Sequence, residues 1–202
     1  MFPLEDSIPN RITPIATFVL IGLNVLAYLL CRELTPPQLE RFFLDFGLVP
    51  ASVAGGERLA FLTRLFLHGG LLHLVGNLWT LWIFGPNVEE RMGPWRFVVF
   101  YVLVGIVAGL AHVATDPHSL IPTIGASGAI AGVMGAYMLL YPRAQILFVI
   151  PILFYPLFFV WPAATYLLYW FALQFLSGAF SHVLRGAAGG GNATGGVPRG
   201  AH

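Results

Sequence analysis

A serine in a glycine-rich turn is the residue of this sequence with the clearest capacity for chemistry. The stretch Gly125-Ala126-Ser127-Gly128 leads into an apolar run that ends at Tyr141. A serine hydroxyl in such a turn can act as a nucleophile when a base and hydrogen-bond donors lie close to it. Serine is also a common cap of a helix N-terminus. The motif alone favours the cap, so a catalytic role depends on partners elsewhere in the chain.

Those partners are sought first in the segment HGGLLHLVGN, which contains His68, His73 and Asn77. His73 and Asn77 are four residues apart and therefore project from one face of a helix. Polar side chains in a membrane span are costly, so a functional role is the default interpretation. His and Asn also join helices by hydrogen bonds, which is the alternative. Together with Ser127, the group favours hydrolysis, because neutral His and Asn can donate hydrogen bonds to an oxyanion.

A base is still needed to take the proton of the serine. The apolar runs contain no Asp or Glu to complete a triad, so we expect a dyad. The candidate bases are the six histidines His68, His73, His112, His118, His182 and His202. His112 and His118 lack the spacing of one helix face, and we expect neither a metal site nor a cofactor there.

The composition indicates an integral membrane protein. Of the 202 residues, 57% are hydrophobic and only 9% are charged, which is too little charge to cover a soluble globule. The net charge of +1 gives no basic surface for a nucleic acid. The lone Cys31 lies near the end of an apolar run, where we expect a packing role.

Five apolar segments predict a polytopic all-α membrane protein. The predicted spans are about 15–31, 71–85, 96–114, 127–141 and 163–181, with a structured loop at 32–70. Gly85-Pro86 is expected to end the second span, and 87–96 to form a polar turn. The prolines within and just after 145–161 predict an interfacial hairpin or an extended excursion. Arginines on short loops favour a cytoplasmic N-terminus.

Three motifs in order resemble those of the rhomboid intramembrane serine proteases. They are HGGLLHLVGN at 68–77, WIFGPNVEERMGPWRF at 82–97 and GASGAIAGVMGAY at 125–137. The resemblance runs from about Arg11 to the C-terminus and implies a six-span helical bundle in a bacterial cytoplasmic membrane. It also implies a Ser–His dyad that cleaves transmembrane segments of substrate proteins within the lipid bilayer, without a cofactor or metal. The oligomeric state is left open.

The resemblance also implies roles for single residues. Ser127 matches the nucleophile of the family, and its backbone N–H matches one of the donors to the oxyanion. His73 and Asn77 match the side chains that complete the oxyanion hole, His68 matches a supporting histidine, and Gly125 gives the turn its room. A non-catalytic rhomboid-like protein that binds membrane clients is the alternative.

The match to the family's general base falls on the last residue, His202. Pro198, Arg199 and Gly200 depart from the usual apolar pattern before it, and no sixth apolar run follows. We therefore expect a membrane domain at 1–182 that carries five of six spans. The Gly-rich tail at 183–202 would be the start of a truncated sixth helix, or else a linker in which His202 matches by accident. Because an unanchored base costs ordering entropy, we expect weak or no activity of this chain.

Overall fold

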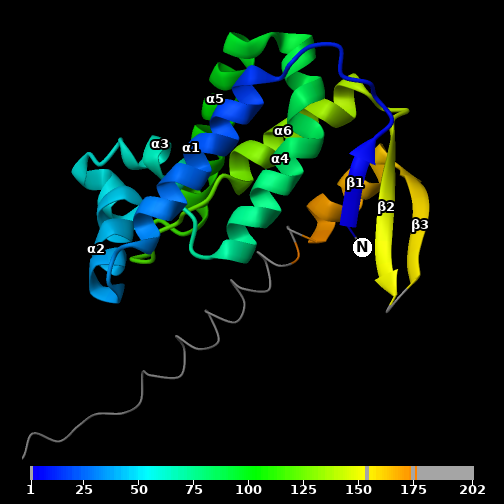
Figure 1. Ribbon diagram of the computed structural model, residues 1–202. Helices are drawn as coiled ribbons and strands as arrows, with labels where there is room; N and C mark the ends of the chain where they lie inside the picture. Colours follow the sequence, from blue (N-terminus) through cyan, green and yellow to red (C-terminus); the bar gives the residue numbers. More distant parts are fainter. Residues whose placement is uncertain (1, 153–154, 174–175, 177–202) are drawn as a thin grey trace, which may run out of the picture. The chain divides into compact units, whose positions relative to one another are not determined.

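The structure is a computed structural model that describes residues 2–152, 155–173 and 176 (Figure 1). In chain order, its elements are β1 (Phe2–Asp6), α1 (Ile15–Arg32), α2 (Pro36–Phe46), the 3-10 turn η1 (Pro50–Gly55), α3 (Ala60–Thr63), the 3-10 turn η2 (Arg64–Phe66), α4 (Leu71–Met92), α5 (Pro94–Thr115), α6 (Ser127–Leu140), β2 (Gln145–Ile152) and β3 (Tyr155–Pro162). A further apolar helix occupies Ala163–Leu173. The chain up to Ala164 forms one unit and the chain from Thr165 a second, and the account below concerns the first.

Four helices form the bundle at the centre of the first unit. α4 packs against α1, α5 and α6, and α5 also packs against α6 (Figure 1). The Phe84 ring of α4 meets the Tyr137 ring of α6 edge to face, with centroids 5.0 Å apart. Large side chains without solvent exposure fill the space between the helices, among them Leu81, Phe84, Phe97, Tyr101, Met134 and Tyr137. The predicted helical bundle is therefore confirmed.

The bundle presents an apolar surface that suits a lipid environment. Among the described residues, α1 and α5 are long and apolar enough to cross a membrane, with mean hydropathies of 1.9 and 2.4. Leucines such as Leu30 and Leu103 are more than half exposed on these two helices. α4, α6 and the shorter apolar helix Ala163–Leu173 overlap the other predicted spans in the sequence, and those spans stay a prediction. The predicted span 163–181 lies in part outside the described residues.

The predicted end of the second span at Gly85-Pro86 is wrong. α4 continues through Pro86 to Met92, and α5 begins two residues later at Pro94. Proline removes one helical hydrogen bond, but neighbouring elements can compensate for it in a membrane helix. Here tertiary contacts stabilise the turns of α4 beyond Pro86, because Asn87 and Glu89 are buried and bind other parts of the chain. Residues 87–96 are therefore mostly helix rather than a polar turn.

Glu89 joins α4 to the beginning of α1. Its carboxylate accepts hydrogen bonds from the backbone N–H groups of Ala16 (2.9 Å) and Thr17 (2.7 Å) and from the Thr17 hydroxyl (2.8 Å). The first N–H groups of a helix have no partner within the helix, and a negative charge is favourable there. Glu89 lies in the part of α4 beyond the predicted span 71–85, which itself contains no Asp or Glu. It serves the packing of α1, far along α4 from His73.

Small residues let α6 approach α5. A Cβ atom at Gly128 would lie 2.5 Å from the Ala108 Cβ, and one at Gly132 would overlap Val104. Both glycines therefore face α5 in a contact that no larger residue allows. At Gly135 nothing lies within 4 Å of such an atom, so this third glycine of the motif does not take part in the same contact. These two contacts hold the first turns of α6 against α5.

Besides the helices, the unit contains a three-stranded antiparallel sheet with the strand order β1-β2-β3. β2 and β3 pair from Gln145↔Pro162 to Ile152↔Tyr155, so the predicted hairpin or extended excursion is a β-hairpin. β1 pairs with β2 between Phe2↔Val149 and Asp6↔Ile146. This N-terminal strand was not predicted, because its partner lies some 140 residues further along the chain.

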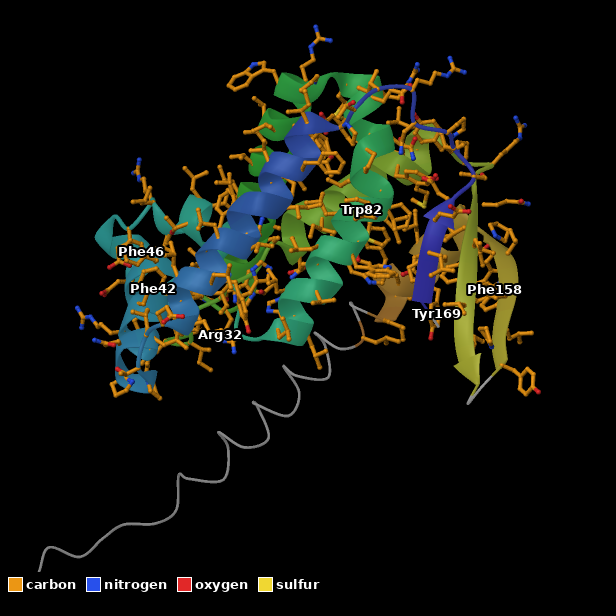
Figure 2. The ribbon with its side chains drawn as sticks, in the orientation of Figure 1. Arg32, Phe42, Phe46, Trp82, Phe158 and Tyr169 are labelled. Carbon is orange, nitrogen blue, oxygen red and sulfur yellow. The ribbon has the colours of Figure 1, made fainter. Side chains whose placement is uncertain are left out.

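The predicted structured loop at 32–70 holds α2, η1, α3 and η2. α2 starts with a capping box, in which the Gln38 side chain accepts a hydrogen bond from the Thr35 N–H at 2.9 Å. No residue of α2 is fully buried, and its Phe42 and Phe46 rings pack on each other with their centroids 4.6 Å apart (Figure 2). The loop thus adds an amphipathic helix at the surface of the unit.

Replacing Glu89 with Gln should destabilise the unit. The amide keeps only one acceptor oxygen for the three donors of α1, and it loses the charge that favours them. We expect a loss of about 1–3 kcal/mol, seen as a lower midpoint of thermal unfolding in detergent. Glu57→Gln is the matched control, because Glu57 is exposed. Equal midpoints for both variants would contradict this account of Glu89.

Candidate functional site

Ser127 is the first residue of α6 and its side chain is exposed. The residue in the N-cap position is Ala126, and no side chain caps this helix. The alternative in which Ser127 serves as the cap is therefore not what the structure shows. Its hydroxyl stays available at the positive end of the helix, where backbone N–H groups have no helical partner.

Gly125 holds the turn before Ser127 in a conformation that favours glycine. Its φ angle is +121°, and its N–H donates to the carbonyl oxygen of Arg64 at 2.9 Å. A Cβ atom there would lie 2.8 Å from Cε1 and 2.9 Å from Nε2 of His73. It would also lie 3.9 Å from Oγ of Ser127. The turn thus brings the imidazole of α4 and the hydroxyl of α6 to the same point, with glycine between them.

His73 and Asn77 share one face of α4, as their spacing predicts. Asn77 is 8% exposed, and its Nδ2 donates to the His73 carbonyl oxygen at 3.1 Å. An amide nitrogen carries two hydrogens, so one remains for another acceptor. Both side chains come from the first two turns of α4, next to the beginning of α6. They can therefore serve as donors on the same side as Ser127.

His68 lies behind His73 and is 2% exposed. The two rings meet edge to face with centroids 5.0 Å apart. Neither ring nitrogen of His68 has a hydrogen-bond partner among the described residues. Burial, and next the neighbouring His73 ring, lower the pKa of His68 from 6.5 to about 4. The imidazole is therefore neutral at physiological pH, and its ring packs edge to face against the His73 ring.

The remaining predicted histidines do not join this cluster. His112 Nε2 lies 2.7 Å from the hydroxyl oxygen of Thr123, and His118 is exposed on the loop after α5. His182 and His202 lie outside the described residues. Within the part of the chain that is described, no group of three or more His, Cys, Asp or Glu residues is placed to hold a metal ion. Cys31 is free and buried at the end of α1.

Arg64 is the residue of this region that the sequence analysis missed. It is 4% exposed, its carbonyl oxygen binds the Gly125 N–H, and its side chain donates to the Gly105 carbonyl oxygen of α5. The signal was present, since Arg64 is a charged residue within an apolar stretch four residues before His68. Such a residue in a membrane protein indicates a function or a partner.

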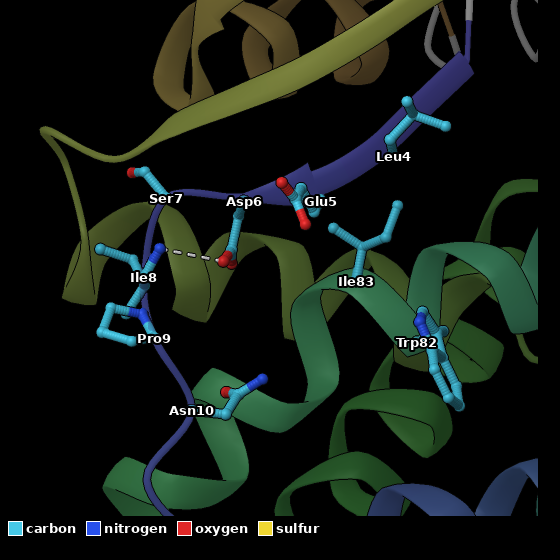
Figure 3. Close-up of a pocket in the computed structure, with 9 residues that line it drawn as sticks. All are labelled: Leu4, Glu5, Asp6, Ser7, Ile8, Pro9, Asn10, Trp82 and Ile83. Carbon is cyan, nitrogen blue, oxygen red and sulfur yellow. Dashed lines mark hydrogen bonds between the residues drawn. The ribbon is translucent and has the colours of Figure 1, made fainter.

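A polar cavity lies elsewhere in the unit. It measures about 510 Å³ and is formed by the segment 4–10 together with Trp82 and Ile83 (Figure 3). Asp6 accepts a hydrogen bond there from the Ile8 N–H at 3.0 Å and another from Asn87 at 2.6 Å. Burial raises the pKa of Asp6. Trp82 is nine residues beyond His73, about 14 Å along α4 at 1.5 Å per residue. This cavity is thus separate from the Ser127 turn.

The fold and the site define a polytopic helical membrane protein in which a serine and a histidine from two helices share one glycine turn. The family model described as Rhomboid domain matches residues 55–197. The match covers most of the chain and all the residues of the Ser127 cluster, so the chain belongs to the rhomboid family.

Named relatives agree with this assignment. Rhomboid protease GluP of Bacillus subtilis is 34% identical over 126 residues, which cover 62% of this chain and 24% of that protein. The putative rhomboid protease YdcA of the same organism is 36% identical over 86 residues, 43% of each chain. Presenilin-associated rhomboid-like protein, mitochondrial, from Homo sapiens is 30% identical over 144 residues, 69% of this chain and 35% of that protein. The chain thus spans between a quarter and a half of the length of these relatives.

Replacing Gly125 with Ala should disrupt the site. The added methyl group meets the His73 ring, and the φ of +121° strains any side chain. We expect a loss of stability of roughly 1–3 kcal/mol, measured by thermal unfolding, together with a large loss of any Ser127 reactivity. Gly135→Ala in α6 is the control, because open space surrounds that position. A Gly125→Ala variant with unchanged stability and reactivity would contradict the geometry of this turn.

Burial of neutral His68 should make stability depend on pH. Its folded pKa of about 4 lies below the ordinary 6.5, so the unfolded chain binds a proton first as the pH falls. Stability is complete above about pH 6.5 and should decrease toward pH 4 by at most about 1.4 kcal/mol per pH unit. Thermal unfolding between pH 7 and 4 measures this, and His68→Gln should have a flatter profile. Parallel profiles would show that His68 does not titrate in this way.

Proposed function

We propose that this rhomboid chain belongs to a serine endopeptidase that cleaves transmembrane segments of other membrane proteins. Ser127 is the nucleophile, and its backbone N–H is one donor to the oxyanion. The observation that carries the proposal is the convergence at Gly125, where His73 Nε2 would lie 2.9 Å and Ser127 Oγ 3.9 Å from one and the same Cβ position. A hydroxyl and an imidazole rarely meet in a membrane bundle without a function.

Acyl transfer by Ser127 needs donors where the negative charge develops. Attack on a peptide carbonyl turns its oxygen into an oxyanion, and preorganised donors lower the barrier most when they are in place beforehand. The exposed start of α6 offers its N–H groups, and the side chains of His73 and Asn77 add two more donors. His68 supports the His73 ring from behind, and Gly125 leaves the space that the His73 ring occupies beside Ser127.

A general base completes the mechanism as a Ser–His dyad. In this proposal His202 takes the proton of Ser127 and later gives it to the leaving amine. A dyad requires a separation of about 3 Å between hydroxyl oxygen and imidazole nitrogen. His202 lies outside the described residues, so support for its role comes from the motif match alone.

The proposed setting is a bacterial cytoplasmic membrane with the N-terminus in the cytoplasm. Substrates would be transmembrane proteins whose helices unwind near Ser127. The exposed apolar side chains of α1 and α5 support a position of the bundle in lipid. The named protease relatives support the reaction class.

Labelling with a fluorophosphonate tests the serine. We expect the purified chain to label slowly and Ser127→Ala to label at background, because the activated hydroxyl forms the covalent bond. Ser52→Ala is the matched control and should label as the wild type does. His202→Ala should remove the labelling if His202 is the base, whereas unchanged labelling would show a reactive Ser127 with another base.

The second candidate, a non-catalytic rhomboid-like protein that binds membrane clients, predicts a different outcome. In that case Ser127→Ala and the wild type label equally, and no transmembrane substrate is cleaved in reconstituted vesicles. Either Ser127-dependent labelling or Ser127-dependent cleavage would reject this candidate.

A further inference from the structure

Arg64 connects the turn before Ser127 to α5, because its backbone binds the turn and its side chain binds α5. Its carbonyl oxygen accepts the Gly125 N–H at 2.9 Å, two residues before the nucleophile. Its guanidinium Nη2 donates to the Gly105 carbonyl oxygen of α5. One residue therefore fixes the distance between the glycine turn and α5.

The guanidinium lies in a space that glycines leave open. A Cβ atom at Gly109 of α5 would lie 3.0 Å from Nη2 and 3.1 Å from Nε of Arg64. A Cβ atom at Gly128 of α6 would lie 3.9 Å from Nη2. The positive charge is therefore buried between α5 and α6, next to the residue that follows Ser127.

No carboxylate neutralises this charge within the described chain. The salt bridge found there joins Arg41 and Asp45 on the surface of α2, and Nε of Arg64 has no hydrogen-bond partner. A guanidinium remains charged when buried, and a buried charge without a counterion is unfavourable in the resting protein. The start of α6 is itself a positive helix end, so Arg64 adds to the positive field there.

We propose that Arg64 is a positioning residue of the Ser127 site, which holds the Gly125 turn against α5 and supplies a buried positive charge behind the nucleophile. The proposal rests on the function proposed above for Ser127. In it the resting site carries an excess of positive charge that the developing oxyanion neutralises. Arg64 does not touch the substrate, since its side chain is enclosed by the two helices.

Two substitutions separate the charge of Arg64 from its packing. Arg64→Lys keeps the positive charge, whereas Arg64→Met keeps an unbranched apolar side chain and removes the charge. Arg58→Met is the matched control, because Arg58 is exposed and lies in the same loop. For each variant the second-order rate constant of fluorophosphonate labelling is measured, and amide hydrogen exchange is followed for the peptide that covers 123–128.

We expect Arg64→Met to lower the rate constant by roughly tenfold, as for a unit charge that acts over several ångströms at intermediate dielectric constant. Arg64→Lys keeps the positive charge and should therefore keep most of the rate constant of the wild type. A purely structural role would lower the rate constant to the same extent in both variants, and this result would overturn the proposal.

Hydrogen exchange keeps the proposal testable if Ser127 proves unreactive. Equal labelling of the wild type and Ser127→Ala would reject the proposed function alone. The positioning role would then be supported by faster exchange of 123–128 in Arg64→Met than in Arg58→Met. Unchanged exchange in Arg64→Met would overturn the proposal, whatever the labelling.

Discussion

The bond between the Glu89 carboxylate and the first N–H groups of α1 is the interaction on which the bundle depends. A membrane offers no water to satisfy a helix end, so each such end must find a partner within the protein. Glu89 supplies three acceptor contacts to Ala16 and Thr17 while remaining fully buried. It thereby fixes the late turns of α4 against α1. α4 must run unbroken through Pro86 to bring this carboxylate to its place.

The other end of α4 carries two residues of the proposed site, His73 and Asn77. Because α4 is anchored through Glu89, His73 and Asn77 project from its first turns at a fixed place, and the glycine contacts of α6 with α5 do the same for Ser127. Between the two helices the Gly125 turn leaves no room for a side chain. His73, Asn77 and Ser127 thus each belong to a helix whose packing is fixed elsewhere, whereas Gly125 and His68 lie in the turns before these helices.

Charge within the bundle is sparse, and each buried charge has a definite place. Glu89 meets a helix N-terminus, where its charge is favourable. Arg64 lies near the start of α6 without a carboxylate partner in the described chain, which is electrostatically unfavourable at rest. Stability alone does not account for such an arrangement, whereas an anion that forms during a reaction would. The rhomboid motifs and the buried Arg64 thus lie at the same end of the bundle, the end at which α6 begins.

The sequence by itself determined the membrane class, the helical bundle and the group His68, His73, Asn77 and Ser127, because apolar run length and helical spacing are local properties. The β-hairpin was also within reach, since its prolines exclude a helix there. Tertiary structure alone decided the continuation of α4 past Pro86, the pairing of β1 with β2 and the burial of Arg64 beside the Ser127 turn. Each of these depends on partners far away in the chain, namely α1, the hairpin and α5. Local conformational preference does not depend on such partners, so it could not predict these three features.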